Sequence, residues 1–354
     1  MMYNLFMLNH LETETPLWDY LKTVNKPIVL YGTGNGADKI IDFASSLNIK
    51  IHGIFASDDF ARGQHFRGYK VLNYNEIKKL LGEVIILQAF GTHRREVLEN
   101  IKYLFKNNEY YVPDIEVCGN DFFTPKIYAD MFGGYEKAYD LLEDELSKTI
   151  FDNLMLFKIS GKPQYIFSND EDVKENTNIL KLFKNEVYVD VGAYDGDTVD
   201  NFINSVKNYK HIYAFEPDRY NFKKLYSKFK NNEKAELFNI AAGSQNGIIK
   251  FNQLKGRQSA SDKNGNYTVA CRKIDALSAD ATYIKIDAEG SELDVLKGAQ
   301  NVIIKNKPKL KVAAYHRFAD LLLPIFIKEI KPVYKVYLRK GAAIPPWDLD
   351  YYFI

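Results

Sequence analysis

The chain has 354 residues, of which 46% are hydrophobic and 26% charged, and its formal net charge is +1. This length exceeds what one hydrophobic core usually supports, so we expect two domains. The near-zero net charge excludes the strongly basic surface that nucleic-acid binding needs, so nucleic acid is not an expected partner.

The two cysteines, Cys118 and Cys271, have no metal-type spacing and are expected to be reduced core residues, which indicates a cytoplasmic protein. The amino end has no basic region before its apolar residues, so it does not resemble a signal peptide. No apolar run reaches membrane-spanning length, and we expect no membrane span.

Short apolar runs alternate with helical patterns in the first third of the chain. The runs 26–32, 49–56, 84–90 and 109–115 are typical of buried parallel strands, and helical patterns lie between them. This alternation predicts a small Rossmann-like α/β domain over residues 1–118. Residues 119–184 contain a long helix-like run at 135–157 and a polar stretch, and we expect a largely helical connector.

A second alternation predicts a larger α/β domain over residues 185–354, with a seven-stranded sheet that ends in an antiparallel pair. Two short alternating runs at 247–254 and 267–274 predict a hairpin inserted at the edge of this sheet. The seven strands are expected at 186–192, 211–217, 235–243, 282–290, 310–316, 334–341 and 348–354.

The segment DVGAYDGDT lies where the first of these strands turns into a helix. Gly192 and Gly196 would let the backbone approach a ligand closely. The neighbouring acids Asp190, Asp195 and Asp197 argue against a phosphate, which prefers backbone amides and cations. A sulfonium cation with an amino-acid tail suits this charge better, although a glycine turn alone is also common in purely structural roles.

The next two strands end in polar residues that fit a nucleoside. Glu216 follows Asp190 by 26 positions, close to the spacing at which an acid reaches both hydroxyls of a ribose. A helix-capping role is the alternative for this acid. Asn239, which small residues follow, could leave a slot for adenine or could be an ordinary turn residue.

The fourth strand runs into IKIDAEGSELDVLKGA and brings three acids to its carboxyl end. Glu292 can be explained by the helix dipole, whereas Asp287 cannot, and we expect Asp287 to face the reacting methyl group. His316 follows the fifth strand and is a candidate proton acceptor.

These residues, in this order, resemble the FkbM family of methyltransferases, whose marks are E-P-D after the second strand and K-I-D-x-E-G-x-E-x-x-x-L-x-G-A after the fourth. The second motif matches from Lys285 to Ala299, and the resemblance covers residues 185–354. A bacterial branch with an added amino-terminal domain is similar at Tyr315 to Arg317, at Leu338 with Arg339 and at Pro346 to Asp348. That branch would have a histidine soon after Arg339, where this chain has lysine and glycine.

The resemblance implies a class I methyltransferase fold, S-adenosylmethionine as methyl donor, and a hydroxyl acceptor on a sugar, glycan precursor or small metabolite. Asp287 and His316 are the predicted catalytic residues. An alternative is that Asp287 and Glu289 bind Mg²⁺, but the main expectation is a site without metal. The predicted donor contacts are Asp190, Gly192, Ala193, Tyr194, Asp195, Gly196, Thr198, Glu216, Pro217, Asp218, Asn239, Ile240, Ala241, Asp287 and Glu289. The predicted acceptor contacts are Arg257, Ser259, Glu289, Arg317 and Arg339. Arg257 and Ser259 could instead contact the donor's carboxylate, or could belong to a polar hairpin tip without a ligand.

The first domain carries a separate glycine pattern. Gly32, Gly34 and Gly36 fit a dinucleotide fingerprint, and Asp58 follows at the end of the next strand. The surrounding sequence resembles small domains of bacterial sugar-modifying enzymes that are associated with nucleotide sugars. Binding of a nucleotide sugar or NAD is therefore the alternative function, and a structural or homodimer-forming role is the default for this domain.

Overall fold

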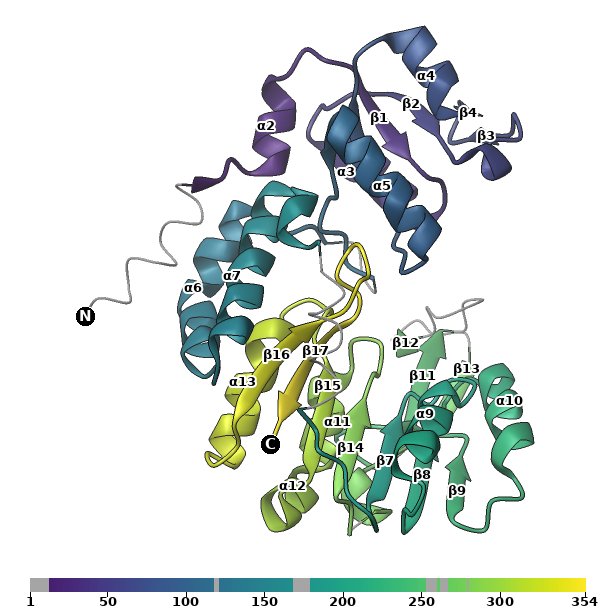
Figure 1. Cartoon of the computed structure of the whole chain (residues 1–354), viewed down its shortest axis with the longest axis vertical. Coiled ribbons are helices and arrows are strands. Elements are labelled where there is room, and N and C mark those ends of the chain that lie inside the picture. Colours follow the sequence, from purple (N-terminus) through teal and green to yellow (C-terminus); the bar gives the residue numbers. More distant parts are fainter. Residues whose placement is uncertain (1–12, 118–120, 168–178, 253–259, 262–266, 279) are drawn as a thin grey trace. The chain divides into compact units, whose positions relative to one another are not determined.

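The structure is a computed structural model that describes residues 13–117, 121–167, 179–252, 260–261, 267–278 and 280–354 (Figure 1). The chain divides into two compact units. Unit 1 comprises Met1–Phe132, Thr149–Val173 and Gly341–Trp347. Unit 2 comprises Gly133–Lys148, Lys174–Lys340 and Asp348–Ile354. Within the described ranges, no helix combines the length and the apolar character that a membrane span requires.

Unit 1 contains a six-stranded sheet in the order β3-β4-β2-β1-β5-β6, in which β3 alone runs antiparallel to its neighbour. All four residues of β1 are buried, which explains why this apolar run forms a central strand. The strands are β1 (Ile28–Tyr31), β2 (Ile51–Phe55), β3 (His65–Phe66), β4 (Tyr69–Leu72), β5 (Ile85–Gln88) and β6 (Glu109–Tyr111). The helices are α2 (Leu17–Thr23), α3 (Asn35–Ser46), α4 (Tyr74–Leu81) and α5 (Arg95–Asn107), with 3₁₀ helices at Asp58–Phe60 and Pro163–Tyr165.

Two helices, α6 (Pro125–Asp140) and α7 (Glu145–Ser160), occupy about half of the predicted connector. The helix-like run expected at 135–157 is interrupted between them. Asp144 explains the interruption, because its carboxylate accepts the backbone N–H of Ser147 at 2.9 Å and so begins a new helix.

Unit 2 is built on a seven-stranded sheet in the order β16-β17-β15-β14-β7-β8-β9. The strand β17 pairs antiparallel with both β15 and β16, and the remaining pairs are parallel. This arrangement confirms the expected sheet with its antiparallel end. The strands are β7 (Val187–Val191), β8 (His211–Phe215), β9 (Ala235–Phe238), β14 (Tyr283–Ile286), β15 (Lys309–Ala313), β16 (Val336–Lys340) and β17 (Leu349–Phe353). The helices are α9 (Asp197–Val206), α10 (Arg219–Phe229), α11 (Glu292–Gly298), α12 (Gln300–Asn306) and α13 (Ala319–Ile330), with a 3₁₀ helix at Ile274–Ala276.

The predicted hairpin is present, but it does not extend the edge of the seven-stranded sheet. It forms a second sheet of four strands in the order β10-β13-β11-β12. The physical reason is that the chain leaves the main sheet after β9, and the next strand, β10, pairs in parallel with β13. These strands are β10 (Ala241–Ala242), β11 (Gly247–Asn252), β12 (Ala260–Ser261) and β13 (Tyr267–Arg272).

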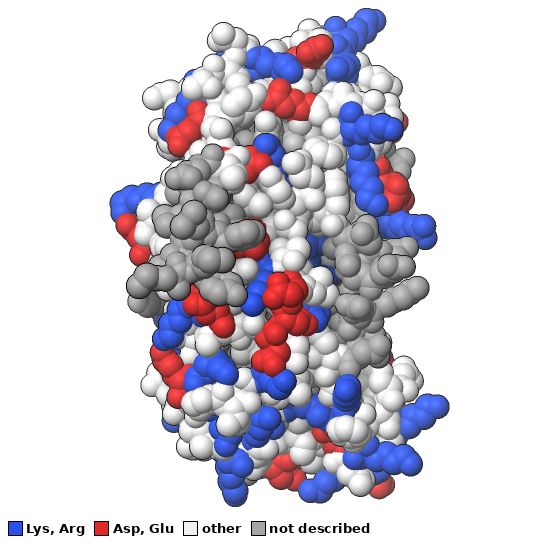
Figure 2. All heavy atoms as spheres, turned by 60° about the vertical axis from the view of Figure 1, so that its left-hand side comes forward, with Lys and Arg blue, Asp and Glu red and all other residues white. Residues whose placement is uncertain are grey.

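The order of the main sheet creates a switch point beside β7. The chain moves from β7 to β8 on one side, whereas β14 pairs with β7 on the other side. Connections therefore leave in opposite directions at the carboxyl ends of β7 and β14, and ligands of open α/β sheets bind at such a point. On the face drawn in Figure 2, acidic and basic side chains are interspersed, in keeping with the near-zero net charge.

Candidate functional site

The turn between β7 and α9 requires glycine at two positions. Gly192 has φ +75°, and a Cβ atom there would lie 1.9 Å from the carbonyl oxygen of Asp287. Gly196 has φ +89°, and a Cβ atom there would lie 2.4 Å from the ring of Phe229. Both glycines allow a left-handed backbone and close packing at the switch point, and their approach to a ligand stays a prediction.

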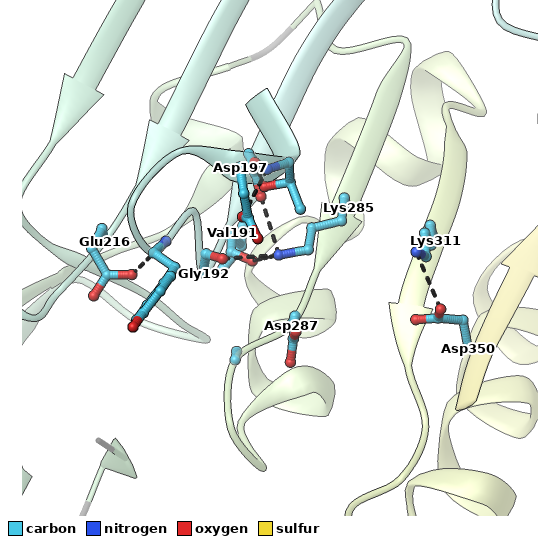
Figure 3. Close-up of polar contacts among 12 residues, drawn as sticks. Val191, Gly192, Asp197, Glu216, Lys285, Asp287, Lys311 and Asp350 are labelled. Carbon is cyan, nitrogen blue, oxygen red and sulfur yellow. Dashed lines mark hydrogen bonds and ion pairs between the residues drawn. The ribbon is translucent and has the colours of Figure 1, made fainter. Parts of the chain in front are cut away.

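Glu216 lies at the end of β8 and points at this turn (Figure 3). Its two carboxylate oxygens accept backbone N–H groups of Tyr194 and Asp218, each at 2.8 Å. Tyr194 has φ +50°, a conformation that costs energy in a non-glycine residue and is typical of functional turns. Each oxygen of Glu216 retains lone pairs that can accept a ligand hydroxyl.

The environment of Glu216 favours its neutral form. The residue is 6% exposed, and burial raises its pKa to about 7, although the hydrogen bonds from the backbone of Asp218 and Tyr194 oppose this shift. A ligand that donates hydrogen bonds to the carboxylate would stabilise the charged form.

Asn239 stabilises the loop that carries Glu216. Its side-chain amide donates to the carbonyl oxygens of Glu216 at 2.9 Å and of Pro217 at 3.2 Å. Asp218 follows in the same loop and caps α10, because its carboxylate accepts the backbone N–H groups of Tyr220 and Asn221. Asn239 and Asp218, both predicted to contact the donor, therefore form hydrogen bonds to the backbone of Glu216 and of residues that follow it.

Lys285 is a buried cation beneath the glycine turn, and its role was not predicted from the sequence. Its Nζ lies 3.3 Å from Oδ1 of Asp190, a residue that is completely buried. The same Nζ donates to the carbonyl oxygens of Gly192 at 2.9 Å and Val191 at 3.3 Å (Figure 3). Thr198 donates its hydroxyl to the other carboxylate oxygen of Asp190. Asp190 therefore connects Lys285, which binds the carbonyl groups of the turn, with Thr198 in α9.

The charge of Lys285 is maintained by its neighbours. Burial alone lowers the pKa of this lysine, but the attraction of Asp190 and Asp287 outweighs burial and keeps the pKa above its ordinary value. All four residues of β14, Lys285 included, are buried. A lysine within such an apolar run is the signal that could have revealed the buried cation.

Asp287 lies directly after β14, where the motif placed it. Its backbone N–H donates to the carbonyl oxygen of Val191 at 3.0 Å, which ties the end of β14 to the end of β7. The hydroxyl of Tyr315 donates to Oδ1 of Asp287 at 2.9 Å. Oδ1 is thus oriented by a neighbour.

Glu292 is 2% exposed, so the helix dipole is only part of its explanation. Its Oε1 accepts the backbone N–H groups of Ala288 at 2.9 Å and Gly290 at 3.0 Å, which closes the turn between β14 and α11. Burial raises the pKa of Glu292 to about 7. Glu289 lies within this turn at φ +49°.

His316 lies beside this turn and is 4% exposed. Its Nε2 is 3.8 Å from a carboxylate oxygen of Glu289 and 3.7 Å from one of Glu292. In the part of the chain that the structure describes, neither ring nitrogen has a hydrogen-bond partner. Burial lowers the pKa of His316 to about 4, so the ring is neutral at pH 7.

The predicted acceptor contacts are not all close to these residues. Arg257 and Ser259 lie outside the described residues, whereas Arg317 follows His316 directly. Arg339 lies in β16, where its guanidinium donates to Asp144 at 2.6 Å and to Ser147 at 2.8 Å. These contacts give Arg339 a structural role in unit 2.

The glycine pattern of unit 1 is explained largely by packing. A Cβ atom at Gly36 would lie 2.2 Å from a backbone oxygen next to β5, and one at Gly32 would lie 2.5 Å from the ring of Phe90. Gly34 precedes α3, and a Cβ atom there would meet open space. Asp58 begins a 3₁₀ helix after β2.

Comparison with known proteins places the site in a methyltransferase fold. Residues 190–329 match the family model described as Methyltransferase FkbM domain. The structure is similar to that of the methyltransferase FkbM from Methylobacillus flagellatus KT, with a TM-score of 0.76 and 19% identity over 100% of this chain and 99% of that one. An rRNA methylase from Streptococcus thermophilus aligns over 49% of this chain and 87% of its own, with a TM-score of 0.32 and 14% identity. No curated protein matches the sequence.

Proposed function

We propose that the chain transfers a methyl group from S-adenosylmethionine to a hydroxyl of a sugar, glycan precursor or small metabolite, since residues 190–329 match the family model described as Methyltransferase FkbM domain. The arrangement of Glu216 carries the proposal. Its buried carboxylate is oriented by two backbone N–H groups and lies at the carboxyl end of the strand next to the switch point. Such an acid can accept hydrogen bonds from both hydroxyls of a ribose.

The charge around the turn supports a cationic methyl donor. Asp195 and Asp197 lie on the turn, and Glu216 and Asp287 lie at the ends of the two strands beside it. The positive charge of Lys285 balances the negative charge of the buried Asp190. A positively charged sulfur is attracted to this group of carboxylates, whereas a phosphate is repelled.

The transfer needs alignment and a destination for the acceptor's proton. In the in-line displacement, the carbon–sulfur bond breaks with its electron pair left on sulfur, and a carbon–oxygen bond forms. Asp287 and His316 are our candidates to take the hydroxyl proton, and they lie in adjacent segments at the carboxyl ends of β14 and β15. The neutral ring of His316 has a nitrogen lone pair for this purpose at pH 7.

Calorimetry with S-adenosylhomocysteine tests the donor site. We expect the purified chain to bind it, and Glu216→Ala to weaken binding at least 100-fold, because two hydrogen bonds to a charged group contribute roughly 1.5–3 kcal/mol each. Glu236→Ala is a matched control, because Glu236 is an exposed acid that pairs with His211 on the next strand. Unchanged affinity in Glu216→Ala, or no heat from the wild-type chain with either the donor or its product, would contradict the proposal.

A further inference from the structure

His316 combines deep burial with unused hydrogen-bonding capacity. The residue is 4% exposed, and both ring nitrogens lack a hydrogen-bond partner among the described residues. Burial of an unsatisfied polar atom costs roughly 1–3 kcal/mol, so such atoms usually face a ligand, an ion or water. Nε2 of His316 lies next to two carboxylates, which limits the ligands that this site could accept.

Three side chains from three segments converge at this point. Asp287 at the end of β14, Glu292 at the start of α11 and His316 after β15 each offer one ligand atom, and these atoms lie within 4.8 Å of one another. Two ligands of one metal ion, each about 2.1 Å from it, are separated by roughly 3 to 4.2 Å. The 3.7 Å between Nε2 of His316 and Oε1 of Glu292 falls in that range and is too long for a hydrogen bond.

The two carboxylates are held by groups around them. Tyr315 donates to Oδ1 of Asp287, and two backbone N–H groups donate to Oε1 of Glu292. Partners of this kind orient metal ligands in proteins and contribute to their affinity. Both carboxylates are therefore held in place, and their remaining lone pairs can bind an ion.

We propose that Asp287, Glu292 and His316 bind one divalent transition-metal ion of the Mn²⁺ or Zn²⁺ type. One imidazole nitrogen with two carboxylate oxygens is a mixed donor set, which suits these ions better than Mg²⁺ or Ca²⁺. Two negative carboxylates and a neutral imidazole balance the charge of the ion, which is required for burial. Three protein ligands leave positions open for a further oxygen ligand.

The use of this ion rests on the proposed methyl transfer. An acceptor hydroxyl bound at an open position would have a lowered pKa, and its oxygen would be fixed near the donor carbon. Because Asp287 and His316 would then be bound to the ion, the hydroxyl proton would pass not to them but to the partly exposed Glu289 carboxylate and on to solvent, while the electron pair of the broken carbon–sulfur bond stays on sulfur.

Metal titration of the full-length chain, without a histidine tag and treated with a chelator, tests the site. Calorimetry with Mn²⁺ and with Zn²⁺ should show one ion per chain, and Mg²⁺ should bind at least tenfold more weakly. His316→Gln and Asp287→Asn should each weaken Mn²⁺ binding at least tenfold. His211→Gln is the matched control, because His211 also lies beside a carboxylate, at 3.1 Å from Glu236, and should leave binding unchanged.

Tyr315→Phe keeps all three ligands and removes only the hydroxyl that orients Asp287. It should weaken Mn²⁺ binding about tenfold, and it keeps the test decisive if a ligand variant does not fold.

S-adenosylhomocysteine is titrated into the same samples. A wild-type chain that binds this product but neither Mn²⁺ nor Zn²⁺ would overturn the metal site alone. A chain that binds one ion but not the product would support the metal site and overturn the proposed methyl transfer. Tighter binding of Mg²⁺ than of Mn²⁺ would overturn the assignment to a transition metal.

Discussion

Glu216 is the residue whose ionisation we expect to control donor binding. Its pKa of about 7 means that the carboxyl is increasingly protonated below pH 7 in the free protein. Hydrogen bonds from ribose hydroxyls favour the charged form, so the ligand must displace that proton. Affinity for S-adenosylhomocysteine should therefore be about tenfold lower at pH 6 than at pH 8, as a single group of this pKa requires.

Glu292 has a similar pKa of about 7, so a control must separate the two acids. Glu292→Gln is suitable because the amide oxygen can still accept the two backbone N–H groups that Oε1 accepts now. Calorimetry between pH 6 and pH 8 should give the same dependence in this variant. A flat profile in the wild-type chain would rule out Glu216 as the controlling group.

At the scale of elements, the turn after β7 is defined by contact with the end of β14. Gly192→Ala would place a Cβ atom 1.9 Å from the backbone oxygen of Asp287 at φ +75°. Strain in the left-handed region and displacement of backbone should together destabilise the protein by about 3 kcal/mol or more. Urea unfolding measures this loss.

The matched variant is Gly247→Ala at the start of β11. No heavy atom lies within 4 Å of the added Cβ position, and the backbone there is outside the left-handed region. We expect a change within about 0.5 kcal/mol, as for most surface substitutions. Equal destabilisation of the two variants would show that the contact between Gly192 and Asp287 does not limit stability.

Elements with a strong apolar period could be predicted from the sequence. The strands β7, β8, β14 and β15 are largely buried runs, the first three of which end in glycine or acidic motifs, and their position fixed the edge on which Glu216 and Asp287 lie. The short hairpin β3–β4 was missed because β3 has two residues with little burial and its turn depends on Arg67 and Gly68 at positive φ. The separate sheet of β11 and β13 could not be predicted, since periodicity does not specify which strand is the partner.

The pairing of the site residues could not be predicted from the sequence either. The motifs identified the acids, but the pairing of Lys285 with Asp190 and the convergence of His316 with Glu292 join residues about 95 and 24 positions apart. Such pairings follow from the order of strands in the sheet. The donor contacts predicted at Asp190 and Asn239 stay predictions, and their observed hydrogen bonds show how they would act through the loops that they hold.

At the scale of the whole molecule, unit 2 extends beyond the predicted boundary at residue 185. Residues 133–148 belong to it, and they supply Asp144 and Ser147 as partners of Arg339, which is 6% exposed. A chain that starts at residue 185 would lack both side-chain partners of this guanidinium. Loss of one partner of a buried pair costs about 3–5 kcal/mol, so we expect the fragment to be unstable in thermal unfolding.

Asp144→Ala in the full-length chain should reproduce much of this loss, because it removes the carboxylate and keeps the rest of unit 2. Glu143→Ala is the control. Glu143 forms an exposed pair with Lys335, and such pairs contribute at most about 1 kcal/mol. A fragment 185–354 that unfolds at the temperature of the intact protein would contradict the role of residues 133–148.

The position of residues 341–347 in unit 1 has a consequence for synthesis. Ile344 forms a bridge with Thr92, and its carbonyl oxygen accepts the side-chain amide of Gln88. The strand β17 follows and inserts between β15 and β16 in unit 2. A growing polypeptide on the ribosome therefore cannot complete either unit before these segments emerge from the exit tunnel, and Gln88 must wait for a contact made 256 residues later.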